Sequence, residues 1–230
     1  GNGNAYGAST DTGAGWAYKG DNGFSISSNI GTKSKSSVKN AAETAYIDTG
    51  LLSEETKTSF ATQVGYTQPR YSVSAIVNLK YNGWADGYLH TADADGAVKD
   101  AAGNTIVAGN HTAYGLRGWW RPEETGSATP SITVGYDTTE YEGSVRTSDM
   151  WFVGLQWQDL INADDKIGLA LAQPTKLDDE TVDPLAWELY YSYKANDSVT
   201  ITPTIFGGQD REGNDGVDIV GGLVQTVFKF

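Results

Sequence analysis

The sequence contains no cysteine, so it has neither a disulfide framework nor a thiolate metal site, and packing and hydrogen bonding must stabilise its fold. It also lacks any run of about 18 apolar residues, which excludes a transmembrane helix. Basic residues are few. The net charge of -13 argues against a nucleic-acid partner, because such proteins carry a basic footprint that neutralises phosphates. The first residues, GNGNAYGAST, have neither the basic nor the apolar region of a signal peptide.

Signatures of enzymes are also missing. The sequence has no G-x-S-x-G motif, phosphate-binding loop, dinucleotide-binding glycine pattern or paired-cysteine motif. Its two histidines, His90 and His111, are too few for a zinc site without carboxylates, and we expect both at the ends of one long loop rather than on a strand. The sequence therefore predicts no enzymatic activity and no cofactor.

One acidic segment resembles a calcium loop in part. Asp93, Asp95 and Asp100 are spaced somewhat like calcium ligands. Position five of the loop is Ala97, however, and the glycine is misplaced for an EF-hand. We therefore favour an ordinary solvated loop over a calcium site and predict no metal.

The sequence does contain many runs in which apolar and polar residues alternate, and this is the pattern of β-strands. Turn residues separate the runs. We expect residues 1–230 to form one all-β domain, a transmembrane antiparallel up-and-down β-barrel. The eleven predicted strands are residues 15–19, 24–31, 59–67, 70–82, 113–121, 131–137, 150–158, 166–173, 186–194, 199–208 and 217–230.

The connections between these runs alternate in length. Short turns at residues 20–22, 67–69, 122–128, 162–165 and 195–197 alternate with longer connections, of which 32–58 and 83–112 are the largest. Short turns at one end and long loops at the other are typical of transmembrane barrels. Val38, Ala42 and Tyr46 suggest a short helix within the first large loop, and we expect one of the two largest loops to fold into the lumen.

Aromatic residues lie at both ends of the apolar face of the predicted strands, with aliphatic residues between them. Two such belts are what a bilayer interface selects, because Tyr and Trp have an apolar body and a polar tip. A soluble β-sandwich, the main alternative fold, would place its largest rings in the middle of its strands. The belt near the short turns includes Tyr71, Trp120, Trp157, Tyr193 and Phe228, and the belt near the long loops includes Tyr81, Tyr114, Tyr136, Trp151 and Trp187.

The opposite face carries mostly basic charges, and we expect it to line a water-filled lumen. Residues predicted deep in the lumen, as candidates for a constriction, are Lys80, Arg117, Arg121, Asp137 and Glu188. Those predicted at the short-turn end, which would face the periplasm, are Lys19, Arg70, Lys166, Lys194 and Lys229. Most other acids fall in the long loops, so the pattern predicts a basic lumen behind an acidic mouth; the alternative is that these charges only keep the wall hydrated.

The C-terminal segment carries a resemblance to a known family. The last strand ends on Phe230, with Phe228 and Val224 on the same face, which is similar to the signal by which bacterial outer-membrane barrels are recognised for insertion by the assembly machinery. The acidic-aromatic strand AWELYYSYK, the ND turn, the strand TITPT and the final FKF resemble the closing hairpin of the carbohydrate-selective OprB-type porins, in the branch of cyanobacterial outer-membrane porins. Earlier hairpins, AYKGDNGFSISSNIG and VGYTQPRYSVSAIVNL, are similar to that group.

The resemblance implies an outer-membrane location, a homotrimer, and passive passage of inorganic ions, sugars or iron. It also implies an N-terminal domain that holds peptidoglycan and a barrel of about 16 strands. Because an odd strand count does not close a usual bacterial barrel, we expect the chain to be the C-terminal portion of a barrel that lacks about five strands. Two other functions stay open at this point: a structural anchor between the outer membrane and the cell wall, and a secreted adhesin or binding module.

Overall fold

The computed structural model describes residues 12–33, 56–81, 110–141, 147–178, 180–210 and 215–229. Eleven strands run through these residues, so every predicted strand is confirmed, most of them longer than expected. The strands are β1 (Thr12–Lys19), β2 (Phe24–Lys33), β3 (Lys57–Gln68), β4 (Tyr71–Tyr81), β5 (His111–Trp120), β6 (Ser131–Tyr141), β7 (Thr147–Gln158), β8 (Lys166–Leu177), β9 (Leu185–Asn196), β10 (Val199–Gln209) and β11 (Ile219–Phe228). No helix in the described part of the chain is long and apolar enough to cross a membrane.

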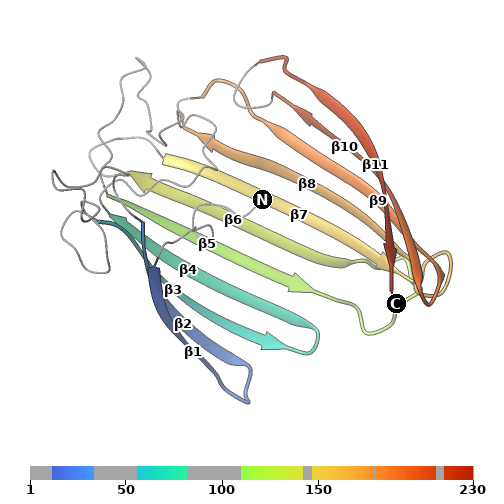
Figure 1. Cartoon of the computed structure of the whole chain (residues 1–230), viewed down its shortest axis with the longest axis horizontal. Helices are drawn as coiled ribbons and strands as arrows, with labels where there is room; N and C mark the ends of the chain where they lie inside the picture. Colours follow the sequence, from blue (N-terminus) through green and yellow to red (C-terminus); the bar gives the residue numbers. More distant parts are fainter. Residues whose placement is uncertain are drawn as a thin grey trace, which may run out of the picture.

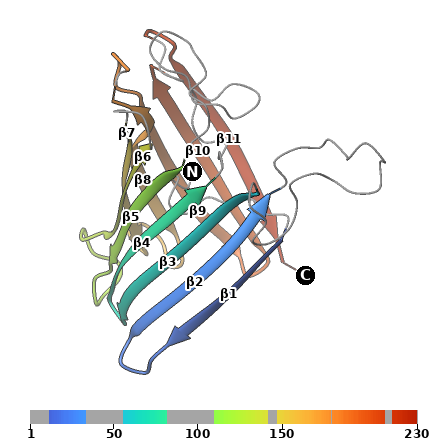
Figure 2. The same ribbon diagram turned by 90° about the vertical axis from the view of Figure 1, so that its left-hand side faces the viewer.

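The strands form one antiparallel sheet in strict chain order, from β1 to β11. Every strand pairs with its neighbours in sequence, so the topology is the predicted up-and-down meander. The sheet is strongly curled: β9 to β11 stand behind β1 to β4, and β5 to β8 form the side between them (Figures 1 and 2). The strands β1 and β11 are not paired with each other, and the described sheet is an open wall rather than a closed barrel.

The two faces of this wall differ in chemistry. Because side chains alternate across a strand, residues that are opposite in register share a face. The convex face exposes aliphatic side chains, with Val73 56%, Leu116 57% and Ile205 50% exposed. On the concave face, buried polar residues such as Asn78, Lys80 and Asp137 outnumber the buried apolar ones. A soluble sandwich would bury its apolar face against a second sheet, so this arrangement rules out the sandwich for the described strands.

The turn between β1 and β2 shows how closely the short connections are packed. Gly23 has a φ of 92°, in the left-handed region that favours glycine. A Cβ atom at this position would lie 2.2 Å from the carbonyl oxygen of Thr67 on β3. The Gly23 carbonyl accepts a hydrogen bond from the Thr67 amide at 2.9 Å. Glycine therefore lets this turn join the next hairpin at the short-turn end of the wall.

The predicted alternation of connection lengths is wrong in detail. The connection between β5 and β6 spans residues 121–130 and that between β7 and β8 spans 159–165, whereas 142–146 joins β6 to β7 at the opposite end. The 121–130 segment folds back onto β7 and is held there. The Gly126 amide donates to the Gln158 carbonyl at 2.9 Å, and the Trp157 indole donates to the Ala128 carbonyl at 2.8 Å.

Candidate functional site: the inner wall

The inner wall is the concave face of the sheet, and its central feature is an ion pair between neighbouring strands. The Arg117 guanidinium on β5 donates to Asp137 Oδ1 on β6 at 2.6 Å. Only 3% of the Asp137 side chain is exposed, against 20% for Arg117. The other carboxylate oxygen, Oδ2, is buried and has no hydrogen-bond partner in the described part of the chain. Since one partner neutralises the other, the pair adds no net charge to the lumen.

Gly135 has no side chain and so makes room for the pair of Arg117 and Asp137. Gly135 lies on β6 between Arg117 on β5 and Phe152 on β7, and it is opposite both in register. A Cβ atom at Gly135 would come within 2.2 Å of the Phe152 ring and 2.9 Å of Arg117 Cδ. The guanidinium therefore lies 5.2 Å above the Phe152 ring centroid, in cation–π geometry across an intervening strand.

Lys80 lies nearer the long-loop end of the same wall, and its side chain is fully buried. It is opposite His111 on β5 and Ser59 on β3. His111 is thus the first residue of a strand, and the expectation that neither histidine lies on a strand was wrong. The strand begins two residues earlier than predicted, because His111 and Thr112 are both polar and give no alternation that would mark its start.

The short-turn end of the wall is mixed in sign rather than basic. Arg70 pairs with Glu123 at 3.0 Å, and Lys194 pairs with Asp164 at 2.9 Å and with Asp197 at 3.1 Å. These three acids come from the short connections at this end of the wall. Two of the predicted cations at this end, Arg70 and Lys194, are therefore paired with acids of the turns.

Four of the predicted cations take positions that differ in exposure and packing. Arg121 follows β5 rather than belonging to it, donates to the Pro69 carbonyl at 2.8 Å, and lies 5.9 Å over the Trp119 ring. Lys19, Lys166 and Lys229 are exposed at strand ends of the short-turn side. None of the four is brought to the ion pair of Arg117 and Asp137, so the structure does not gather the predicted constriction residues at one place.

Glu188 is on β9, several strands away from the ion pair, and directly opposite Phe206 on β10. With Asp137 it is one of two carboxylates that the register places on the inner face of the described strands. Unlike Asp137, it makes no hydrogen bond or ion pair with any residue that the structure describes. The two inner-wall carboxylates therefore differ: Asp137 is paired with Arg117, and Glu188 is not paired within the described strands.

Inner-wall rings lie over glycines that are directly opposite them. Tyr190 covers Gly168, Phe152 covers Gly135 and Phe206 covers Gly221. The Tyr190 hydroxyl also donates to Gln156 Oε1 at 2.9 Å. Because each glycine has no side chain, its partner ring can rest against the wall.

The convex face carries the predicted aromatic girdle at its short-turn end. Tyr71 begins β4 opposite Trp120 at the end of β5, and the Tyr66 and Tyr71 ring centroids lie 6.3 Å apart. Phe228 is 60% exposed at the end of β11, and Trp157 and Tyr193 lie near the same ends of β7 and β9. The sequence analysis missed Trp119, which the register places on the inner face next to Trp120. The girdle role itself stays a prediction.

Several predicted features lie outside the described residues: the acids Asp93, Asp95 and Asp100, the residue His90, the short helix around Ala42, and the insertion residue Phe230. Across the part of the chain that is described, no group of three or more His, Cys, Asp or Glu side chains could hold a metal ion. The calcium alternative and the insertion signal therefore remain predictions.

The fold is that of outer-membrane β-barrels. OmpT of Vibrio cholerae, an outer membrane protein folded in vitro, superposes with a TM-score of 0.53, and its trimer form with a TM-score of 0.50. Each comparison covers 96% of this chain and 65% of OmpT, at 12% sequence identity. The chain thus spans 65% of the length of the protein it resembles. No family model matches the sequence, and no curated protein matches it either.

These comparisons bear on two expectations from the sequence. They show an outer-membrane barrel fold, but they do not support membership of the OprB family or a cyanobacterial origin. The exclusion of enzymatic activity was also wrong as an inference. A likeness to the outer membrane protein OmpT at 12% identity shows the fold alone, and one fold supports unrelated activities, so missing sequence motifs do not exclude an enzyme.

Proposed function

We propose that the chain is part of the wall of an outer-membrane porin, through which small hydrophilic solutes diffuse passively. The observation that carries this proposal is the difference between the two faces of the curled sheet. Its convex face exposes aliphatic side chains between aromatic ends, and its concave face carries polar and charged side chains. Such a wall suits lipid on the outside and water on the inside.

The direction of the edge strands bears on how the barrel is completed. Both β1 and β11 run toward the short-turn end, since Lys19 enters the first short turn and Phe228 is opposite Val199, which follows the last one. Ordinary antiparallel closure therefore needs an odd number of further strands. We propose about five, which gives a total of about 16, the strand number that the resemblance to OprB-type porins implies. Their addition would satisfy both open edges, whose exposure to lipid is costly.

The partners of the proposed porin follow from its surfaces. The convex face would contact outer-membrane lipid, with Tyr71, Trp120, Trp157, Tyr193 and Phe228 at one interface. The C-terminal strand would be recognised by the barrel-assembly machinery. The resemblance to OprB-type and cyanobacterial porins supports a homotrimer, a peptidoglycan-binding domain, and inorganic ions, sugars or iron as solutes. A trimer form is also described for OmpT.

Single-channel recording from the complete protein in planar bilayers tests the pore. We expect discrete, long-lived open steps whose conductance scales with salt concentration, because solute diffuses through water-filled space. Heat-denatured protein provides the control for detergent artefacts. Protein that is shown to be inserted, by protease protection of its strands, and that still gives no conductance would reject the porin and favour the anchor function.

A further inference from the structure

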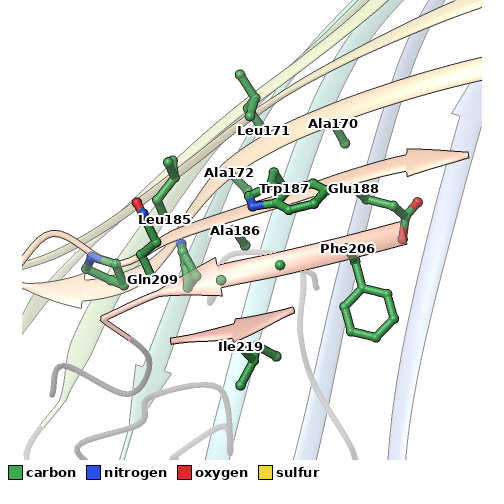
Figure 3. A pocket seen from close by; sticks show the side chains of 14 residues that line it. Ala170, Leu171, Ala172, Leu185, Ala186, Trp187, Glu188, Phe206, Gln209 and Ile219 are labelled. Atoms are coloured by element: carbon green, nitrogen blue, oxygen red, sulfur yellow. The ribbon is translucent and has the colours of Figure 1, made fainter. Parts of the chain in front are cut away.

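The inner wall at β8, β9 and β10 differs in chemistry from the part at β5 and β6 that holds the ion pair of Arg117 and Asp137. A pocket of about 490 Å³ opens here, and small side chains form its floor: Ala170 and Ala172 on β8 and Ala186 on β9. Phe206 and Ile219 border this floor, and Glu188 is its only charged lining residue among the described strands (Figure 3). The site thus combines a shallow apolar floor with one carboxylate.

Glu188 and Phe206 are held side by side by the register of the sheet. They are directly opposite each other on β9 and β10, so both side chains emerge from the same face at adjacent positions (Figure 3). The Phe206 ring lies over Gly221, where a Cβ atom would come within 2.7 Å of it. Because Gly221 has no side chain, this ring can lie against the wall at the border of the pocket.

The charge of Glu188 has no counter-charge in the described structure. The other inner-wall carboxylate, Asp137, is matched by Arg117 at 2.6 Å, whereas Glu188 makes no hydrogen bond or ion pair among the described residues. Its side chain is exposed to the lumen. A carboxylate in this position attracts cations, and an adjacent aromatic face adds a cation–π contact. The three alanines leave room for an apolar body beside the charge.

We propose that this pocket, the Glu188 pocket, is a binding subsite for small organic cations that join an ammonium or guanidinium group to a flat apolar body. The cation would contact the Glu188 carboxylate and the Phe206 ring, and the apolar body would lie on Ala170, Ala172 and Ala186. The proposal rests on the proposed pore, because the solute reaches Glu188 from the lumen.

Binding of benzylammonium to the complete protein in detergent tests the subsite without relying on conductance. Isothermal titration is expected to show saturable binding that weakens at least tenfold in Glu188→Gln and in Phe206→Leu. Glu124→Gln removes the same charge from the exposed β5–β6 connection and is expected to bind benzylammonium like the unmodified protein. Benzyl alcohol, which has the same ring without the charge, is expected to bind much more weakly.

Several outcomes would overturn the subsite. Equal binding by Glu188→Gln, equal binding of benzyl alcohol, or saturable binding of a neutral sugar in place of benzylammonium would each do so. In planar bilayers, benzylammonium is expected to interrupt the open current of the unmodified protein and not that of Glu188→Gln. Open channels without this difference reject the subsite alone, whereas inserted protein without channels rejects the pore.

Discussion

The ring of Tyr190 covers Gly168, its direct partner on β8, so closely that a Cβ atom on residue 168 would lie 2.1 Å from the ring. The bond between the Tyr190 hydroxyl and Gln156 Oε1, 2.9 Å long, fixes the far end of the ring. The width of the proposed pore therefore depends on Tyr190, whose ring can lie against the wall because Gly168 has no side chain.

Gly168→Ala is expected to lift the Tyr190 ring off the wall and into the lumen. The hydrogen bond to Gln156 would be lost, at a cost of about 1 kcal/mol, and the open channel would conduct less. Single-channel recording measures the second effect. Gly154→Ala is the matched control, because a Cβ atom there would meet its nearest neighbours at 3.9 Å and 4.0 Å. Equal conductance in the two variants would show that Tyr190 does not limit the bore.

Arg117→Ala is expected to destabilise the protein because it leaves the buried Asp137 carboxylate without its partner. Breaking one side of a buried ion pair costs about 3 kcal/mol or more. The denaturation midpoint in detergent is the measurement. Replacing both residues, as in Arg117→Met with Asp137→Leu, should recover most of the lost stability, since no charge then remains buried. A double variant as unstable as the single one would contradict this account.

Trp119 and Trp120 are adjacent in sequence, but we expect Trp119 to face water and Trp120 to face lipid. The register places Trp120 on the convex face and Trp119 on the inner face. In single-tryptophan variants, with the other tryptophans replaced by Phe, brominated lipids should quench Trp120 fluorescence and leave Trp119 largely unaffected. Acrylamide in water should quench Trp119 more strongly. Equal quenching of both by lipid would contradict the assignment of the faces.

Asp159 is expected to make the β7–β8 turn sensitive to acid. Hydrogen bonds from Thr125 and from the Asp164 amide, the latter 2.7 Å long, hold the pKa of Asp159 below its ordinary value of 3.8. A lowered pKa in the folded state means that the carboxylate stabilises the turn above pH 3.8, and that this contribution is lost as the pH falls through the folded pKa.

Hydrogen exchange of the Asp164 amide measures this effect locally. Protection is expected to be constant at neutral pH, after correction for the intrinsic exchange rate, and to decrease below the ordinary pKa of Asp. Asp159→Asn should lower protection at neutral pH and remove its acid dependence. An amide whose protection is unchanged by acid would show that Asp159 does not hold the turn.

The sequence predicted the strands well because their signal is local. Alternation of apolar and polar residues depends only on the pleat, so it identified all eleven strands and the faces of residues such as Trp151 and Glu188. The contacts across the wall depend on register, which one sequence does not specify. For this reason the pair of Arg117 with Asp137, and the rings over Gly135 and Gly168, could not be predicted.

The predictions of connection lengths and of a basic lumen failed because they too depend on contacts between strands and connections that are distant in sequence. The length of a connection does not show at which end of the barrel it lies when, as in residues 121–130, the segment folds back onto a strand. The prediction of a basic lumen was drawn from the charges of the strands, but Glu123 and Asp164 in the short turns pair with Arg70 and Lys194. A basic lumen was therefore expected where the structure has ion pairs.

The shared direction of β1 and β11 also limits what can fill the seam between them. Two copies of this sheet inserted in the same orientation would meet with β11 of one beside β1 of the other, and both strands would run the same way. Self-association could then seal the wall only through parallel seams, which transmembrane barrels rarely use. Unpaired backbone at these two edges is costly in lipid, so strands of opposite direction are favoured at both seams, and a homotrimer of the proposed porin would form by contact between completed walls rather than by sharing them.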